Sequence, residues 1–248
     1  MKKCFTAFLL LAVVLCGCGK RVADNERLNI AVRELRSGDT QKSIAQLEAV
    51  LKNNPDNCSA RLLMALNHEK NGQLNEALDM ASAVAAEFPD SFAALYTCGR
   101  LRMHFPQYRR NAYQVLCNAH ELNRDDIPTL IALCNLGTEL KYKNVLQYIN
   151  LLKNKPEYAK NNVLNYQLGK CLILHGKRRE ALDALKSAVN GLSDFNLLFN
   201  IARTIDINQL DRTYAVQLYR LYLRLPAKMR NAAAADYANR RVRTIGGR

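Results

Sequence analysis

The first half of the sequence repeats itself with a fixed period. Gly38 and Gly72 are 34 residues apart, and so are Pro55 and Pro89. The segments SIAQLEAVLKNNPDN and ALDMASAVAAEFPDS align at the same spacing without a gap. Apolar residues recur three and four positions apart, which indicates helices, and beyond Ala23 no run alternates apolar and polar residues as a strand would. Such a period predicts a stack of helical units, each burying its apolar face against its neighbours.

This pattern resembles the tetratricopeptide repeat family, in which a glycine separates two helices and a proline follows the second. Ser43 and Ala77 stand at the family's small position, where the two helices cross closely. A later copy, NYQLGKCLILHGKRREALDALKSAVNG, matches the signature in order at Leu168, Gly169, Gly176, Ala181, Leu185 and Ala188. The resemblance implies an all-α fold, a right-handed α-α superhelix of about six helix pairs over residues 25–226. A capping helix and basic tail are expected over 227–248. The copy at about 128–155 has a shortened second helix, so its register is open.

The start of the chain predicts export. Lys2 and Lys3 precede an apolar run from Phe5 to Leu15, which is shorter than the roughly 20 residues that a spanning helix needs. Leu15-Cys16-Gly17-Cys18 resembles the bacterial lipobox, which implies cleavage before Cys18 and acylation of its thiol. Two or three acyl chains anchor a protein stably on a bilayer.

We therefore expect a signal peptide over 1–17 and a lipidated linker over 18–24. By resemblance to Gram-negative lipoproteins, Gly19 after the cysteine favours the outer membrane, with the chain facing the periplasm. The alternative is an ordinary signal peptide with incidental cysteines.

In the tetratricopeptide family, the first helix of each pair lines a concave groove. The family's fifth position falls on Leu28, Leu62, Tyr96, Cys134, Tyr166 and Phe199, and its ninth on Val32, Leu66, Arg100, Thr138, Lys170 and Arg203. The early groove is aliphatic, whereas the later part sets rings beside cations, which are common binding anchors. We predict that a protein partner binds at Tyr96, Arg100, Tyr166, Lys170, Phe199 and Arg203. For Phe199 and Cys134, packing between helices is the alternative.

No enzyme motif is found in the sequence, and no cofactor is expected. The chain has no nucleophile elbow, phosphate-binding glycine loop or H-E-x-x-H motif, and its four histidines are expected to be surface or groove residues. Once the signal is removed and Cys18 is acylated, five cysteines remain, and an odd number cannot pair completely. Buried thiols are the favoured interpretation. One bridge, such as Cys98 with Cys134, is left open.

The positive charge gathers at one end. The formal net charge is +14, and residues 212–248 hold nine basic residues against one acidic residue, Asp236. Arg240, Arg241 and Arg243 could contact an anionic surface, although solvated capping charge is the commoner reason for such an end. Nucleic acid fits the charge but not the export signal.

Two functions follow from these features. The first is a lipid-anchored scaffold that holds a protein partner in the cell envelope during assembly of an outer-membrane complex. Among such lipoproteins, the chain most resembles type IV pilus pilotins, which escort secretin subunits. The second is a surface-binding protein whose basic end contacts anionic lipid or wall polymer, with the repeats as a spacer. Repeats define an architecture and do not name the ligand.

Overall fold

The computed structural model describes residues 22–246, and every regular element in that range is helical. The longer helices are α2 (Val22–Ser37), α3 (Thr40–Asn53), α4 (Cys58–Lys70), α5 (Leu74–Glu87), α6 (Phe92–Arg102), α7 (Arg109–Leu122), α8 (Ile127–Glu139), α9 (Val145–Lys153), α10 (Asn162–Leu174), α11 (Arg178–Ser187), α12 (Phe195–Ile207), α13 (Arg212–Leu223) and α14 (Ala232–Gly246). Short 3-10 turns, η1 (Pro106–Tyr108) and η2 (Ala227–Met229), precede α7 and α14. Over the described range the helices thus follow one another as six pairs and α14, as the repeat pattern predicts.

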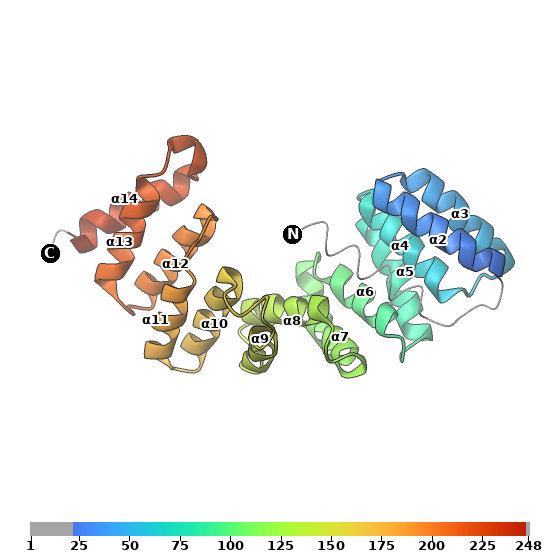
Figure 1. The fold of residues 1–248 in the computed structure, drawn as a ribbon, viewed down its shortest axis with the longest axis horizontal. Coiled ribbons are helices and arrows are strands. Elements are labelled where there is room, and N and C mark those ends of the chain that lie inside the picture. The colour runs from blue at the N-terminus through green and yellow to red at the C-terminus, as the bar shows by residue number, and fades with distance from the viewer. Residues whose placement is uncertain (1–21, 247–248) are drawn as a thin grey trace. The chain divides into compact units, whose positions relative to one another are not determined.

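The described residues divide into two compact units, 22–136 and 137–246, with the boundary inside α8. In the first unit, α2 to α7 each pack against the next helix in the chain, and α2 also contacts α4, as α4 contacts α6. In the second unit, α9 to α14 pack in the same order, and α10 contacts α12. Within each unit the first helices of successive pairs therefore lie side by side (Figure 1). Each unit is a stack of α-α hairpins.

Glycine lies in the turn that separates the two helices in three of the six pairs of residues 22–246. Gly38, Gly72 and Gly176 have φ angles of 93°, 80° and 73°, in the left-handed region that side chains with a Cβ rarely adopt. A polar side chain then often opens the next helix. Asp39 accepts a hydrogen bond from the backbone N–H of Lys42, and Asn57 accepts one from that of Ala60. The repeating glycine in the sequence is thus a conformational requirement.

Other small residues lie where helices cross. Ser43 and Ala77 are fully buried, as their position in the repeat predicts. The Ser43 hydroxyl donates to the carbonyl of Ala31 at 2.9 Å and accepts from Asn67 Nδ2 at 2.9 Å. A single hydroxyl therefore ties α3 to both α2 and α4. At this crossing the small side chain brings backbones close and also satisfies buried polar groups.

The structure shows the two helices of the fourth pair, at about 128–155, where the sequence leaves the repeat register open. Helix α9 has nine residues, so the shortened second helix of the fourth pair is confirmed. The turn before it passes through Lys141 at φ 61°. This left-handed turn occupies the position at which the first, second and fifth pairs carry glycine, and Gln209 does the same between α12 and α13 at φ 50°.

The five cysteines within the described residues are thiols. Cys58, Cys98, Cys134 and Cys171 are buried and Cys117 is half-buried, as the helical pattern predicts. Cys98 is a free thiol whose Sγ lies 3.6 Å from Ser82 Oγ, so the alternative of a bridge to Cys134 is not realised. These thiols act as small apolar side chains in the helix interfaces.

Candidate functional site

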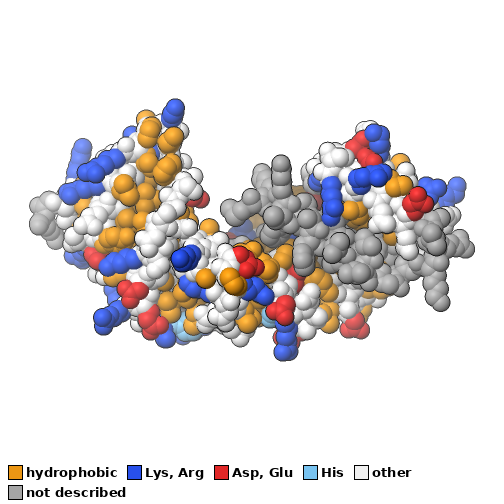
Figure 2. Space-filling view, viewed as in Figure 1, with side chains coloured by type: hydrophobic (Ala, Val, Ile, Leu, Met, Phe, Trp, Pro, Cys, Tyr) orange, Lys and Arg blue, Asp and Glu red, His pale blue; other side chains and the backbone are white. Residues whose placement is uncertain are grey.

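Four of the predicted groove residues come together in the second unit. Tyr166 and Lys170 lie one turn apart on α10, and Phe199 and Arg203 lie one turn apart on α12. Tyr237 of α14 joins them through the ring of Phe199. We call these five residues the aromatic–cation face. Figure 2 shows hydrophobic side chains gathered over α12 and α14, with Lys and Arg beside them.

The α10 part of this face is held by polar contacts. Lys170 Nζ lies 5.4 Å from the centre of the Tyr166 ring, a cation–π arrangement. The Tyr166 hydroxyl is 3.3 Å from Thr204 Oγ1, which joins α10 to α12. Burial lowers the pKa of Lys170, although the nearby Glu139 carboxylate acts in the opposite direction. Because its charge is partly desolvated, this ammonium would gain from an acidic partner group.

The α12 and α14 part is a cluster of rings with a cation over it. Phe199 and Tyr237 meet edge to face, with their ring centres 5.9 Å apart and an interplanar angle of 86°. Phe199 also lies 5.4 Å from the ring of Tyr222, so the alternative in which it packs between helices is partly confirmed. The Arg203 guanidinium lies 5.5 Å from the centre of the Tyr237 ring. Packing on α13 and α14 therefore fixes the ring of Phe199, while Arg203 remains exposed.

A hollow of about 400 Å³ opens beside this cluster. Phe199 and Tyr237 supply its apolar lining, and Asn196, Asn200 and Arg203 supply polar groups. An asparagine amide both donates and accepts hydrogen bonds, so it can pair with the backbone of a bound peptide. The hollow therefore combines ring surface, a cation and backbone-matching amides.

Tyr96 and Arg100 belong to the first unit and are engaged within the chain. Tyr96 is fully buried, stacks on Phe92 with ring centres 6.0 Å apart, and has its pKa raised by burial. Arg100 donates twice to Glu69 of α4, at 2.6 Å each. His104 Nε2 lies 3.3 Å from the same carboxylate. Burial acts to raise the pKa of Glu69, but the hydrogen bonds and charge of Arg100 outweigh it and lower the pKa overall. Tyr96 and Arg100 remain predicted groove residues without an exposed contact surface in the structure.

The three arginines proposed for an anionic surface differ in their contacts. Arg241 forms a two-point ion pair with Asp206 of α12, whose side chain is 2% exposed. The Arg241 guanidinium therefore neutralises a buried carboxylate, and its contact with an anionic surface stays a prediction. Arg240 is exposed and pairs with Asp236 one turn earlier. Arg243 is exposed.

The candidate site offers ring surface, cations and amides, which are groups that bind a partner. Among residues 22–246, no cluster of three or more His, Cys, Asp or Glu could hold a metal ion. In the same range, no helix is both long and apolar enough to span a bilayer. The predicted signal peptide and Cys18 lie outside the described residues.

Sequence reasoning missed Tyr237, although a signal for it exists. Tyr237 is 34 residues after Arg203, one full period along the chain. Helix α14 therefore occupies the place of a seventh first helix, and the groove positions continue into it. From the sequence, 227–248 are predicted only as a capping helix and basic tail, so the predicted groove positions do not extend into this helix.

Comparisons with known proteins agree with this architecture. A family model described as tetratricopeptide repeat matches residues 34–104. The search of curated proteins returned no match. Among solved structures, the tetratricopeptide protein YrrB is 16% identical with a TM-score of 0.59, covering 69% of this chain and 87% of its own. One structure of MamA is 20% identical with a TM-score of 0.55, covering 64% and 92%. A tetratricopeptide repeat protein from Parabacteroides merdae is 18% identical with a TM-score of 0.51, covering 88% and 84%.

At these identities the structures establish the fold, an all-helical α-α solenoid. The family match places the tetratricopeptide repeat pattern at residues 34–104, and the solved structures show that the rest of the chain is similar in fold to proteins with such repeats. Proteins of this class generally mediate protein–protein interactions, and their scaffold is typically not enzymatic.

Proposed function

We propose that the protein is a lipid-anchored scaffold that holds a partner protein on the periplasmic side of a bacterial outer membrane. The observation that carries the proposal is the aromatic–cation face, where two rings, the Arg203 cation and asparagine amides line one hollow, and the Tyr166–Lys170 pair lies on the neighbouring helix α10. YrrB, a neighbour in fold, is described as having an unusual peptide-binding site. The chemistry of the face suits a segment that carries both apolar and acidic side chains.

Partner binding can be tested by reversing the charges of the two cations on this face. Replacing Lys170 and Arg203 with glutamate should reduce the amount of partner recovered with the full-length protein by at least about tenfold, since both cations sit beside ring surface. The protein would be tagged, extracted from membranes in mild detergent, and its co-purifying proteins quantified by mass spectrometry. The charge-matched control replaces Arg110 of α7 and Arg179 of α11, both exposed and outside the face, with glutamate. Equal losses in the two variants would contradict a binding role for the face.

The identity of the recovered protein tests the finer proposal. Recovery of a secretin or pilin subunit would support a pilotin role in type IV pilus or secretin assembly. Recovery of barrel-assembly subunits would replace that role with another one in the same envelope.

The anchor is tested separately at Cys18. We propose, from the lipobox residues, that this thiol carries the diacylglyceryl group and that further acylation follows cleavage. Cys18→Ala should move the protein from the membrane fraction to the soluble fraction, because the buried acyl carbons that hold it on the bilayer are lost. A variant that still sediments with membranes after a high-salt wash would contradict lipid anchoring.

A further inference from the structure

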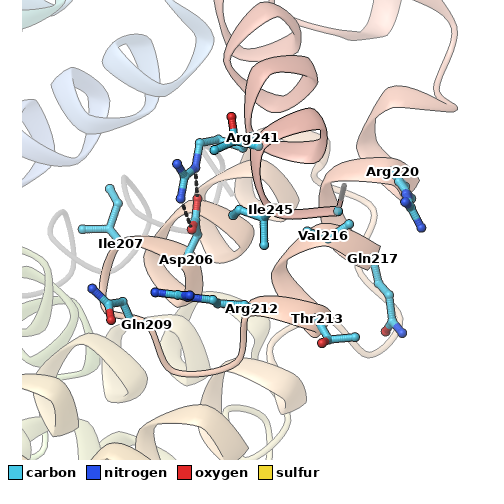
Figure 3. Close-up of a pocket in the computed structure, with 12 residues that line it drawn as sticks. Asp206, Ile207, Gln209, Arg212, Thr213, Val216, Gln217, Arg220, Arg241 and Ile245 are labelled. Carbon is cyan, nitrogen blue, oxygen red and sulfur yellow. Dashed lines mark hydrogen bonds and ion pairs between the residues drawn. The ribbon is translucent and has the colours of Figure 1, made fainter. Parts of the chain in front are cut away.

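A larger hollow, of about 710 Å³, lies elsewhere on the second unit (Figure 3). It is formed by the C-terminal turn of α12, one side of α13 and the C-terminal turn of α14. None of its lining residues belongs to the aromatic–cation face. We call it the α13 pocket.

Three arginines line the α13 pocket, and a single acidic residue accompanies them. That residue, Asp206, is already neutralised. Its carboxylate accepts from Arg241 Nε and Nη2 at 2.7 Å each and from the Tyr219 hydroxyl at 3.2 Å. The other two arginines, Arg212 and Arg220, are not neutralised by this carboxylate. Both of their side chains are exposed. The pocket therefore has a net positive charge that an anionic ligand would complement.

The spacing of these two arginines sets the kind of ligand. Arg212 and Arg220 are eight residues apart on α13, which separates them by about 12 Å along the helix axis at 1.5 Å per residue. In Figure 3 they lie toward opposite ends of the pocket. An extended peptide rises about 3.3 Å per residue, so two carboxylates four residues apart span about the same distance.

Apolar side chains share the lining between the arginines with Thr213 and Gln217. Ile245 and Val216 lie between Arg241 and Arg220 in Figure 3, and Ile207, at the other side, is 57% exposed. An exposed isoleucine at the edge of a hollow gains free energy when an aliphatic side chain covers it. The pocket therefore fits a segment that alternates acidic and apolar side chains better than it fits a purely ionic ligand.

We propose that the α13 pocket binds an extended acidic segment of a partner protein, with two carboxylates at Arg212 and Arg220 and an aliphatic side chain between them against Ile207, Val216 and Ile245. Arginine suits this role because its planar guanidinium pairs with a carboxylate through two hydrogen bonds. The surface is additional to the proposed scaffold face and does not depend on it.

The test measures binding of a defined probe to the detergent-solubilised full-length protein. The probe is a fluorescein-labelled peptide Gly-Ser-Glu-Ser-Leu-Ser-Glu-Ser-Gly, followed by fluorescence anisotropy at low salt. Replacing Arg212 and Arg220 together with glutamine should raise the Kd at least about tenfold, because both charge-assisted contacts are lost. The matched control replaces Arg224 and Arg243, which are exposed and outside the pocket, with glutamine and should leave the Kd within about twofold.

A second variant tests the apolar part of the pocket. Ile207→Ser should weaken binding of the leucine-containing probe and leave binding of a probe with serine in place of leucine unchanged. Arg203→Glu, on the aromatic–cation face, should leave both unchanged, which separates this pocket from the proposed function. Circular dichroism would show that each variant keeps its helical content.

Three outcomes would overturn the proposal. Equal weakening by the Arg212/Arg220 and Arg224/Arg243 pairs would show diffuse charge attraction. Absence of saturable probe binding up to about 1 mM would rule out even the weakest specific affinity. Loss of binding to phosphatidylglycerol vesicles in the Arg212/Arg220 pair, without saturable peptide binding, would assign the arginines to lipid head groups.

Discussion

Replacing Arg241 with alanine is expected to lower the free energy of unfolding of the second unit by about 2–4 kcal/mol. The reason is the carboxylate that Arg241 neutralises. Asp206 is 2% exposed at its side chain, and without Arg241 it would keep only the hydrogen bond from Tyr219. Arg241 itself is 34% exposed, so water can partly replace it, and the expected loss lies below that of a fully buried pair.

Urea denaturation followed by circular dichroism would measure this loss. Hydrogen exchange of the α14 amides would locate it, because this ion pair joins α14 to α12. The matched control is Arg240→Ala, whose pair with Asp236 is more than 60% exposed on both sides and should contribute under about 1 kcal/mol. Tyr219→Phe should cost about 1 kcal/mol, the usual net value of one hydrogen bond. If Arg241→Ala were no more damaging than Arg240→Ala, the ion pair would not hold the end of the solenoid together.

The ion pair between Arg241 and Asp206 could not be predicted from the sequence. Charge counting places nine basic residues after residue 211 but cannot tell which guanidinium meets a buried carboxylate in another helix. The partner, Asp206, is 35 residues earlier, and in the first unit Arg100 pairs with Glu69 at a separation of 31. Both separations are close to one repeat length. In a stack of this period, opposite charges about one repeat apart on first helices are the pairs to test.

The features that were predicted correctly depend on short-range geometry. The 34-residue spacing of Gly38 and Gly72 specifies left-handed turns, and these recur in the structure. The pairing of Tyr166 with Lys170 and of Phe199 with Arg203 follows from one helical turn on neighbouring first helices. Whether a groove side chain is exposed depends on longer-range packing, which is why fully buried Tyr96 could not be distinguished from half-buried Tyr166.

The second large effect is expected at a helix crossing. A Cβ at Gly169 of α10 would lie 2.6 Å from Leu185 Cγ, 2.7 Å from Leu185 Cδ2 and 3.2 Å from the carbonyl oxygen of Ala181. Gly169→Val should therefore lower the free energy of unfolding by about 3 kcal/mol or more, because α10 and α11 must separate. Gly169→Ala should cost less, since the helix propensity of alanine returns about 1 kcal/mol against the strain. Urea denaturation would measure both changes.

The control is Gly176, which lies in a left-handed turn and not at a helix crossing. A Cβ at Gly176 meets nothing within 4 Å, yet its φ of 73° is strained for any other residue. Gly176→Ala should therefore cost about 1–2 kcal/mol whatever residue stands at 185. The penalty at Gly169 should instead depend on Leu185. In a Leu185→Ala background, where the clashing atoms are removed, Gly169→Ala should become neutral or stabilising, a coupling of about 1–2 kcal/mol. An additive result would mean that the crossing is not limited by Leu185, and that another contact, such as the Ala181 carbonyl oxygen, sets the space at Gly169.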